Sequence, residues 1–194
     1  SLYAWPFYTT RAGVHSQTWA IIKSRNYGTE WSTYEMDFSS GGSQSGAIKN
    51  QVLAGAGGGI AMPLHAIMNQ YEFNARAQCA FSEFGFEYPD GSRLHGVYRD
   101  FEGTGRMRPK GYACAAANKA IMPTMVDTVQ SGDNPGWTQS AINGVGAPTP
   151  MKYVSSFAYR DSNAWSLILF NFHMTTSLPV RLSELNDELG GAQR

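Results

Sequence analysis

The chain has 194 residues, enough for one or two domains with a substantial apolar core. Lys and Arg together number 15, as do Asp and Glu, and this low, balanced charge argues against nucleic acid or an anionic membrane surface as a partner. Aromatic residues make up 13% of the chain, a content that favours carbohydrate over DNA as the partner.

The amino-terminal part predicts strands and a helix in alternation. Residues 2–8, LYAWPFY, predict a buried strand with Pro6 near its end. Residues 14–23 predict a short helix, and residues 27–31 predict the next strand. Strand, helix and strand together span about thirty residues, the size of a βαβ unit.

Residues 47–69 carry apolar side chains at intervals of three and four, which predicts an amphipathic helix or a broken pair of helices. The glycine run at residues 55–59 indicates a break or a close backbone contact, because each Gly costs a helix roughly 1 kcal/mol relative to Ala. No Lys-Ser/Thr pair follows this run, so a phosphate-binding loop is not expected there.

The middle of the chain predicts two more strands and a helix. Aromatic and acidic residues alternate toward the end of residues 75–88, and residues 94–101 follow a Pro-Asp-Gly turn, so both segments predict strands. Pro109 begins a helix predicted over residues 109–121.

Beyond residue 121 the helical periodicity disappears. The segments there are short, apolar and separated by turn sequences, which predicts an antiparallel β-sandwich. The predicted strands are residues 124–128, 152–159, 164–172 and 178–185. We therefore expect two domains, residues 1–121 and residues 122–194.

The order of these elements resembles the carboxyl-terminal half of a retaining (β/α)8 glycoside hydrolase, in which a β-sandwich follows the barrel. On this resemblance LYAWPFY corresponds to barrel strand six, YGTEW to strand seven and AQCAFSEF to strand eight. RPKGYACAAANKAI corresponds to the closing helix, and SLILFNF with LPVRLSEL resembles a hairpin of the sandwich. The expected fold class is α/β plus all-β: a partial (β/α)8 barrel followed by a small antiparallel β-sandwich.

The nucleophilic glutamate of that family ends strand seven, which implies Glu30 as the residue that attacks the anomeric carbon and forms a glycosyl-enzyme. Trp5, Tyr8 and Trp31 would line the sugar subsite by stacking, and His95 would hydrogen-bond a sugar hydroxyl. These residues also have interpretations without a functional role. Glu30 fits a solvated glutamate at the end of a strand, and His95 fits an ordinary histidine within a strand. No cofactor or metal is expected.

The proton donor of the family, an Asn-Glu pair, ends strand four, and strands one to five have no counterpart in this sequence. The resemblance therefore implies the amino-terminal part of the same barrel as a partner, besides the carbohydrate substrate. Glu35, Glu83 and Glu87 are candidate substitutes for the acid, the last two on one face of a predicted strand.

A second hypothesis is a non-catalytic carbohydrate-binding or structural module, which the aromatic content and the missing acid favour. Cys79 and Cys114 fit two free thiols or one disulfide, and they leave the cellular compartment open.

Overall fold

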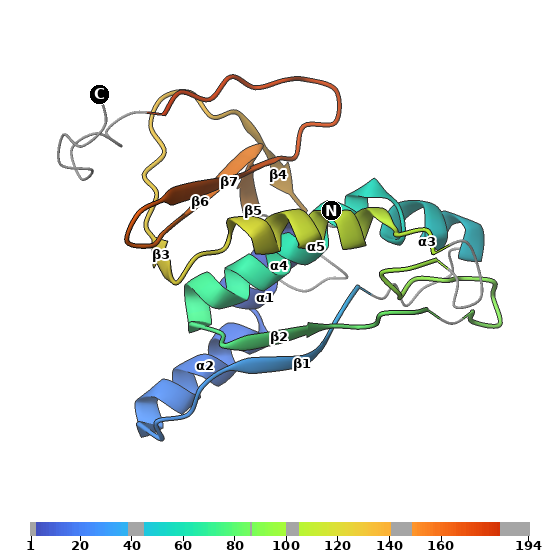
Figure 1. Ribbon diagram of the computed structural model, residues 1–194, viewed down its shortest axis with the longest axis horizontal. Coiled ribbons are helices and arrows are strands. Elements are labelled where there is room, and N and C mark those ends of the chain that lie inside the picture. Colours follow the sequence, from blue (N-terminus) through green and yellow to red (C-terminus); the bar gives the residue numbers. More distant parts are fainter. Residues whose placement is uncertain (1–2, 39–44, 86, 100–104, 141–148, 183–194) are drawn as a thin grey trace.

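The computed structural model describes residues 3–38, 45–85, 87–99, 105–140 and 149–182, and its architecture is mixed α/β. Two helices lie at the centre, with a parallel pair of strands on one side and antiparallel strands on the other (Figure 1). Among the described residues the strands form no closed barrel.

The chain begins with two helices, α1 (Ala4–Arg11) and α2 (Val14–Arg25). The helix predicted over residues 14–23 is confirmed, whereas the strand predicted over residues 2–8 is wrong from residue 3 onward. Residue 2 of that prediction lies outside the described residues. Pro6 is the third residue of α1, and a proline is tolerated there because the first turn of a helix has no intrahelical use for its N–H.

The strand predicted over residues 27–31 is also misplaced, since β1 runs over Ser32–Met36. Two residues with positive φ, Asn26 and Gly28, lead the chain out of α2. Because these left-handed conformations interrupt an extended backbone, the strand begins only after Trp31.

The helical segment after β1 is a broken pair, α3 (Gly46–Leu53) and α4 (Ala56–Phe73). The Ser45 side chain accepts a hydrogen bond from the Ile48 N–H and caps α3. The break lies at Ala54 and Gly55, where the glycine run begins, and a Cβ on Gly58 in the first turn of α4 would lie 1.7 Å from the Leu53 carbonyl oxygen. The predicted close backbone contact is therefore confirmed.

After α4 the chain returns to β2 (Ala77–Ala80), which pairs in parallel with β1. Helix α4 covers one face of this pair: Gln78 donates to the Ala66 carbonyl and accepts from the Asn69 amide. The side chains of Tyr34 and Cys79 are exposed. Within the described part of the chain, the other face of the pair thus stays open.

The segment between β2 and the next helix is irregular. The strands predicted over residues 75–88 and 94–101 are wrong beyond Ala80, since Tyr98 makes only isolated bridges with Phe84 and Met107. Residues 86, 100 and 101 of these two predictions lie outside the described residues. Helix α5 (Pro109–Ala120) follows as predicted, with Pro109 in its first turn.

The carboxyl-terminal strands are antiparallel, in a sheet of order β3-β6-β7 and a separate hairpin β4-β5. They are β3 (Thr124–Val126), β4 (Gly136–Gln139), β5 (Thr149–Lys152), β6 (Val154–Arg160) and β7 (Trp165–Asn171). The strands predicted over residues 124–128, 152–159 and 164–172 are confirmed as β3, β6 and β7, and β4 and β5 were not predicted. No strand forms over residues 178–182, and residues 183–185 of that prediction lie outside the described residues.

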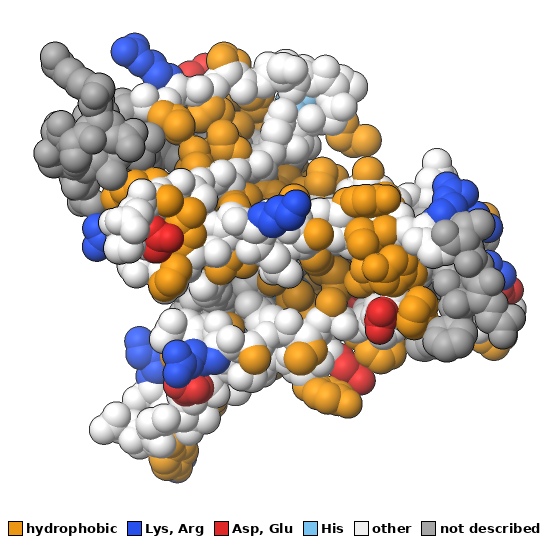
Figure 2. Space-filling view, viewed as in Figure 1, with side chains coloured by type: hydrophobic (Ala, Val, Ile, Leu, Met, Phe, Trp, Pro, Cys, Tyr) orange, Lys and Arg blue, Asp and Glu red, His pale blue; other side chains and the backbone are white. Residues whose placement is uncertain are grey.

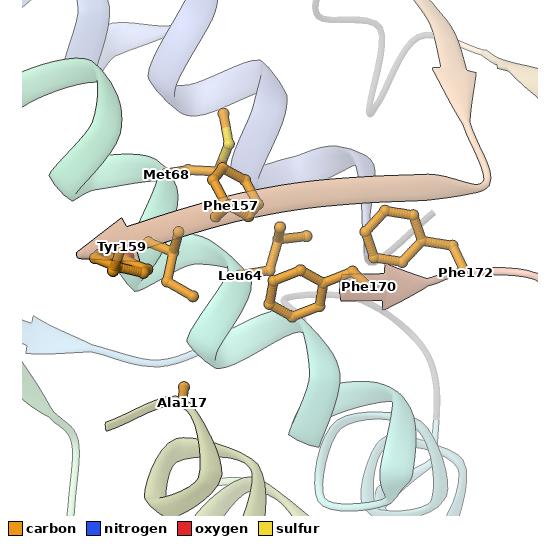
Figure 3. Packing of buried hydrophobic residues seen from close by; sticks show 8 residues of the cluster. Leu64, Met68, Ala117, Phe157, Tyr159, Phe170 and Phe172 are labelled. Atoms are coloured by element: carbon orange, nitrogen blue, oxygen red, sulfur yellow. The ribbon is translucent and has the colours of Figure 1, made fainter. Parts of the chain in front are cut away.

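Helix α4 is the centre of the apolar core. Its residues Leu64, Ile67 and Met68 pack with α5 and with the inner side chains of β6 and β7, including Phe157 and Phe170 (Figure 3). A second buried cluster includes Ala61 and Met62 of α4 and reaches the carboxyl end of β1. The helix therefore connects the parallel pair to the antiparallel sheet.

No single helix of the described segments is long and apolar enough to cross a bilayer, although α3 and α4, bent by 56° at their break, pass such a test together.

Candidate active site

The carboxyl ends of β1 and β2 lie side by side at one end of the parallel pair. The pairing register between the two strands changes there. Thr33 pairs with Gln78 and Met36 with Ala80, so β1 carries one residue more than β2 over this stretch. The bulge contains Tyr34 and Glu35. Bulges bend a strand and re-aim its side chains, and they recur beside active sites.

Glu35 is exposed at this bulge and has no hydrogen-bond or ion-pair partner among the described residues. The neighbouring ring of Tyr34 is 84% exposed. A carboxylate beside an open aromatic ring, at the carboxyl end of a parallel strand, has the chemistry of a nucleophile or proton carrier next to a stacked sugar.

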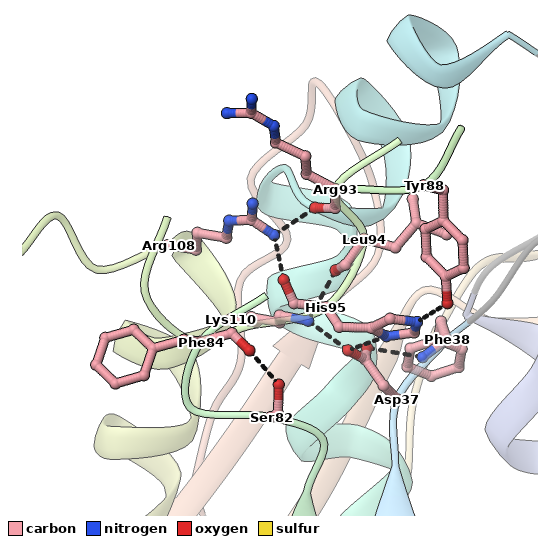
Figure 4. A network of polar contacts seen from close by, with 10 residues as sticks. All are labelled: Asp37, Phe38, Ser82, Phe84, Tyr88, Arg93, Leu94, His95, Arg108 and Lys110. Atoms are coloured by element: carbon pink, nitrogen blue, oxygen red, sulfur yellow. Dashed lines mark hydrogen bonds and ion pairs between the residues drawn. The ribbon is translucent and has the colours of Figure 1, made fainter. Parts of the chain in front are cut away.

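One residue beyond β1, the Asp37 carboxylate is buried in a polar network (Figure 4). Its Oδ1 accepts the Phe38 N–H at 2.7 Å. Its Oδ2 accepts hydrogen bonds from Lys110 Nζ at 2.5 Å and from His95 Nδ1 at 2.9 Å. The side chains of Asp37 and Lys110 are only 7% and 1% exposed, so this ion pair is shielded from solvent.

Burial lowers the pKa of the Lys110 ammonium, and the charge of Asp37 acts against that shift. Lys110 also donates to the Leu94 carbonyl at 2.9 Å. Arg108, at the amino end of the same helix, donates to the Arg93 and His95 carbonyls. Helix α5 thus fixes the loop after β2 against the end of β1.

Both ring nitrogens of His95 are occupied. The Asp37 carboxylate can only accept, so Nδ1 of His95 carries the proton that joins them. Nε2 lies 2.9 Å from the Tyr88 hydroxyl, which donates to it when the ring is neutral. These two hydrogen bonds hold the His95 imidazole in place beside the carboxyl end of β1. Figure 4 shows the ring flanked by Tyr88 and Asp37.

Glu30 is the carboxylate predicted from the sequence as the nucleophile. It lies at the opposite end of the parallel pair, where the strands begin. Its Oε1 is 3.0 Å from Nε of Arg76, and the Glu30 side chain is 61% exposed. Arg76 precedes β2 as Glu30 precedes β1, so the ion pair joins the amino ends of the two strands. Among the described residues, Glu30 does not line the cavity between α3 and the amino end of α5 or the one beside β6.

The other residues of the predicted site lie apart from Glu30. Trp31 packs on Phe73, with ring centroids 5.0 Å apart, in an aromatic cluster between α2 and α4. Trp5 and Tyr8 contact each other on α1 at 5.9 Å. His95 is buried in the Asp37 network and does not lie on a strand. The structure therefore brings only His95 close to the carboxyl end of β1.

No protein-family model, curated protein or solved structure matches this chain. The geometry of the chain's own residues therefore carries the functional argument.

The described residues contain no group of three or more His, Cys, Asp or Glu side chains that could hold a metal ion. Cys79 and Cys114 are both free thiols, which decides between the two alternatives left open by the sequence.

Two substitute acids proposed from the sequence can also be placed. Glu87 forms an exposed ion pair with Arg93 in the loop after β2, and Glu83 is exposed in the same loop. They do not share the face of a strand, because β2 ends at Ala80. Glu35, the third substitute, is the one that ends a parallel strand.

The aromatic cluster between α2 and α4 contains a stacked pair of histidines, His15 and His65, with ring centroids 5.8 Å apart. Burial, with a smaller contribution from the charge of His15, lowers the pKa of His65 to about 4. Nδ1 of each ring is buried without a hydrogen-bond partner within the described residues. The folded chain therefore resists protonation of this pair.

We expect the free energy of unfolding to fall by roughly 2 to 3 kcal/mol between pH 6.5 and pH 4.5 because of His65. The folded-state pKa lies below the unfolded value, so this contribution is complete above pH 6.5 and is lost as the unfolded state takes up the proton. Urea denaturation at both pH values measures the difference. In His65→Leu this part of the pH dependence should disappear, and an unchanged slope would refute the assignment.

Proposed function

We propose that this chain is the carboxyl-terminal part of a retaining (β/α)8 glycoside hydrolase, with β1 and β2 as consecutive barrel strands and Glu35 as the nucleophile. The supporting observation is the position of Glu35 in a bulge at the carboxyl end of a parallel strand. Catalytic side chains of (β/α)8 enzymes lie at that end of the strands. Glu35 takes the role that the sequence suggested for Glu30, because β1 begins after Glu30.

The arrangement from β1 through α3 and α4 to β2 supports the barrel assignment. Two parallel strands are joined by helices, and one of these helices covers a face of the strand pair. Parallel sheets occur with both faces covered, yet the face that carries Tyr34 is open among the described residues. In a complete barrel the remaining strands would enclose this face and pair with both free edges.

The segments after β2 are consistent with the same assignment, whereas the segment that the resemblance gave to barrel strand six forms helix α1. Helix α5 follows β2, as the last helix of a barrel follows its last strand, and the antiparallel strands β3 to β7 come after it. The division into residues 1–121 and a β-sandwich at residues 122–194 belongs to this proposal.

The acid in this proposal comes from barrel strands outside this chain. Retention requires two carboxyl groups about 5 to 5.5 Å apart. Glu87 forms an ion pair with Arg93 in the loop after β2 and does not lie at the end of a parallel strand. The partner of Glu35 is therefore expected at the end of a neighbouring strand of the same barrel.

The test is hydrolysis of a panel of aryl glycosides by the full-length polypeptide, meaning the complete product of the reading frame that encodes this chain. Proton NMR should show that the first sugar product keeps the anomeric configuration of the substrate. Inversion would exclude a covalent nucleophile. Binding of polysaccharide without hydrolysis would instead favour the non-catalytic module.

A further inference from the structure

The cavity beside β6 lies between the helices α1 and α4 and the strands β3, β5 and β6. Its volume of about 310 Å³ falls within the roughly 300 to 1,000 Å³ of small-molecule sites. Tyr71 of α4 lines this cavity and packs on β6, whereas Ala66 and Asn69 of the same helix contact β2. Helix α4 therefore lies between this cavity and the parallel strands that carry Glu35.

One wall of the cavity is aromatic. It contains Phe7 of α1, Tyr71 of α4 and Phe157 of β6, and the last two rings meet edge to face with centroids 6.2 Å apart. The Tyr71 side chain is 43% exposed, and its hydroxyl donates to the Asp127 carboxylate at 3.1 Å. This hydrogen bond and the contact with Phe157 hold an open aromatic ring in place at the cavity.

A second wall carries uncharged polar side chains from β6 and the segment after β3. Ser156 donates to the Thr128 hydroxyl at 3.0 Å and accepts from the Gln130 amide at 3.0 Å. These bonds fix the three side chains relative to one another before a ligand enters. The neighbouring Ser155 side chain makes no hydrogen bond within the described part of the chain, so its hydroxyl can bind a ligand.

The cavity has little net charge. Its cationic lining residues are Arg11 and Lys152, and no carboxylate lines it within the described segments. The Arg11 guanidinium pairs with Glu72 at 2.7 Å and lies over the Phe7 ring, so its charge is balanced. On the face shown in Figure 2, hydrophobic side chains cover more of the antiparallel strands than charged side chains do. This lining favours an uncharged ligand over an anion.

We infer that the cavity beside β6 is a second carbohydrate site, which binds a short neutral saccharide without cleaving it. A sugar ring presents C–H groups on its faces and hydroxyl groups around its rim. The faces fit the aromatic wall, and the hydroxyls fit the donors and acceptors of the polar wall. The choice of a saccharide rests on the proposed function, whereas the small-molecule site rests on the cavity itself. Cleavage would require a pair of carboxyl groups, which this lining does not supply.

Isothermal titration of the full-length polypeptide tests the inference with cellobiose, xylobiose, maltose, mannobiose and cyclohexylmethanol. The last of these is an apolar ring with a single hydroxyl. We expect at least one disaccharide to bind more tightly than cyclohexylmethanol, through a component that depends on Tyr71. Binding of cyclohexylmethanol as tight as that of the best disaccharide would overturn the saccharide assignment.

Tyr71→Ala supplies the first variant, and it should weaken this binding at least about tenfold because the aromatic surface is lost. Tyr112→Ala is the matched control, since Tyr112 is an exposed tyrosine of α5 outside the cavity lining. It should bind as the wild type does. Equal affinities of the two variants for every disaccharide would overturn the inference.

Ser155→Ala is the second variant, because its hydroxyl has no partner within the described residues and its loss should leave the fold intact. The affinity should fall about threefold or more with the lost hydrogen bond to the ligand. Ser162→Ala is the matched control: Ser162 is exposed in the turn between β6 and β7, beyond the other end of β6. Unchanged affinity in Ser155→Ala would exclude the polar wall and with it the saccharide assignment.

These titrations are independent of turnover. If hydrolysis fails and a disaccharide still binds in a Tyr71-dependent manner, the enzyme proposal falls and the second carbohydrate site remains. If hydrolysis succeeds and no disaccharide binds in that manner, the second site falls and the enzyme proposal remains.

Discussion

The Glu35→Gln variant of the full-length polypeptide is expected to lose at least about 1,000-fold in kcat toward an aryl glycoside, because removal of a covalent nucleophile costs several orders of magnitude. Gln keeps the size of the side chain and cannot attack the anomeric carbon. Initial rates of phenolate release measure the effect. The exposed position of Glu35 means that the substitution should leave the folded structure intact, which circular dichroism can check.

Glu30→Gln is the matched control, because it makes the same change at the amino end of β1 and breaks only the exposed pair with Arg76. Such surface pairs contribute about 0 to 1 kcal/mol, and kcat should stay within about twofold of the wild type. In Glu35→Ala, added azide should restore turnover and give a glycosyl azide of inverted configuration. A large loss in Glu30→Gln with normal kcat in Glu35→Gln would reverse the assignment.

The Lys110→Met variant is expected to lose about 3 to 5 kcal/mol of unfolding free energy. The change leaves the Asp37 carboxylate buried without the ammonium that lies 2.5 Å away, and a buried charge without its counterion is costly. It also releases the Leu94 carbonyl from its bond to Lys110. Because folded domains have only about 5 to 15 kcal/mol in total, urea denaturation should show a large shift of the midpoint.

Lys119→Met is the control on the same helix, since Lys119 is exposed near the end of α5. Its effect should stay within about 0.5 kcal/mol. The double variant Asp37→Asn with Lys110→Met removes both charges and should recover part of the loss. A single variant as stable as Lys119→Met would mean that the Asp37 network contributes little to the fold.

Helices α2 to α5 could be predicted from the sequence because their signals are local, whereas the segment that forms α1 was predicted as a strand. Pro109 in the first turn and the alanines behind it predict α5, and the spacing of apolar residues predicts α3 and α4 with a break at the glycines. These patterns act within a few turns of chain. Tertiary contacts were not needed to recognise them.

The strands near the site could not be placed in the same way. Residues 27–31 have strand-like composition, yet Asn26 and Gly28 adopt positive φ and move the start of β1 to Ser32. That shift moves Glu30 from the carboxyl end of a strand to its amino end, and it moves Glu35 into the place that Glu30 was expected to occupy. The residue at which β1 begins therefore decides which carboxylate is the candidate nucleophile.

The buried network was invisible for a different reason. Asp37 and Lys110 are 73 positions apart, and their sequence contexts are a strand end and an alanine-rich helix. Burial of both side chains depends on how α5 packs against the loop after β2, which no local pattern encodes. The position of Asp37 directly after β1 gave no signal either, because the sequence predicted that strand over residues 27–31.

The most direct test of Glu35 as a retaining nucleophile is covalent trapping. The full-length polypeptide is incubated with an activated 2-deoxy-2-fluoroglycoside of a sugar that it hydrolyses, and the digested protein is mapped by mass spectrometry. The proposal predicts one added fluoroglycosyl group on the peptide that contains β1, attached at Glu35. Attachment at Glu30, or turnover without a trapped glycosyl-enzyme on any residue of this chain, would contradict it.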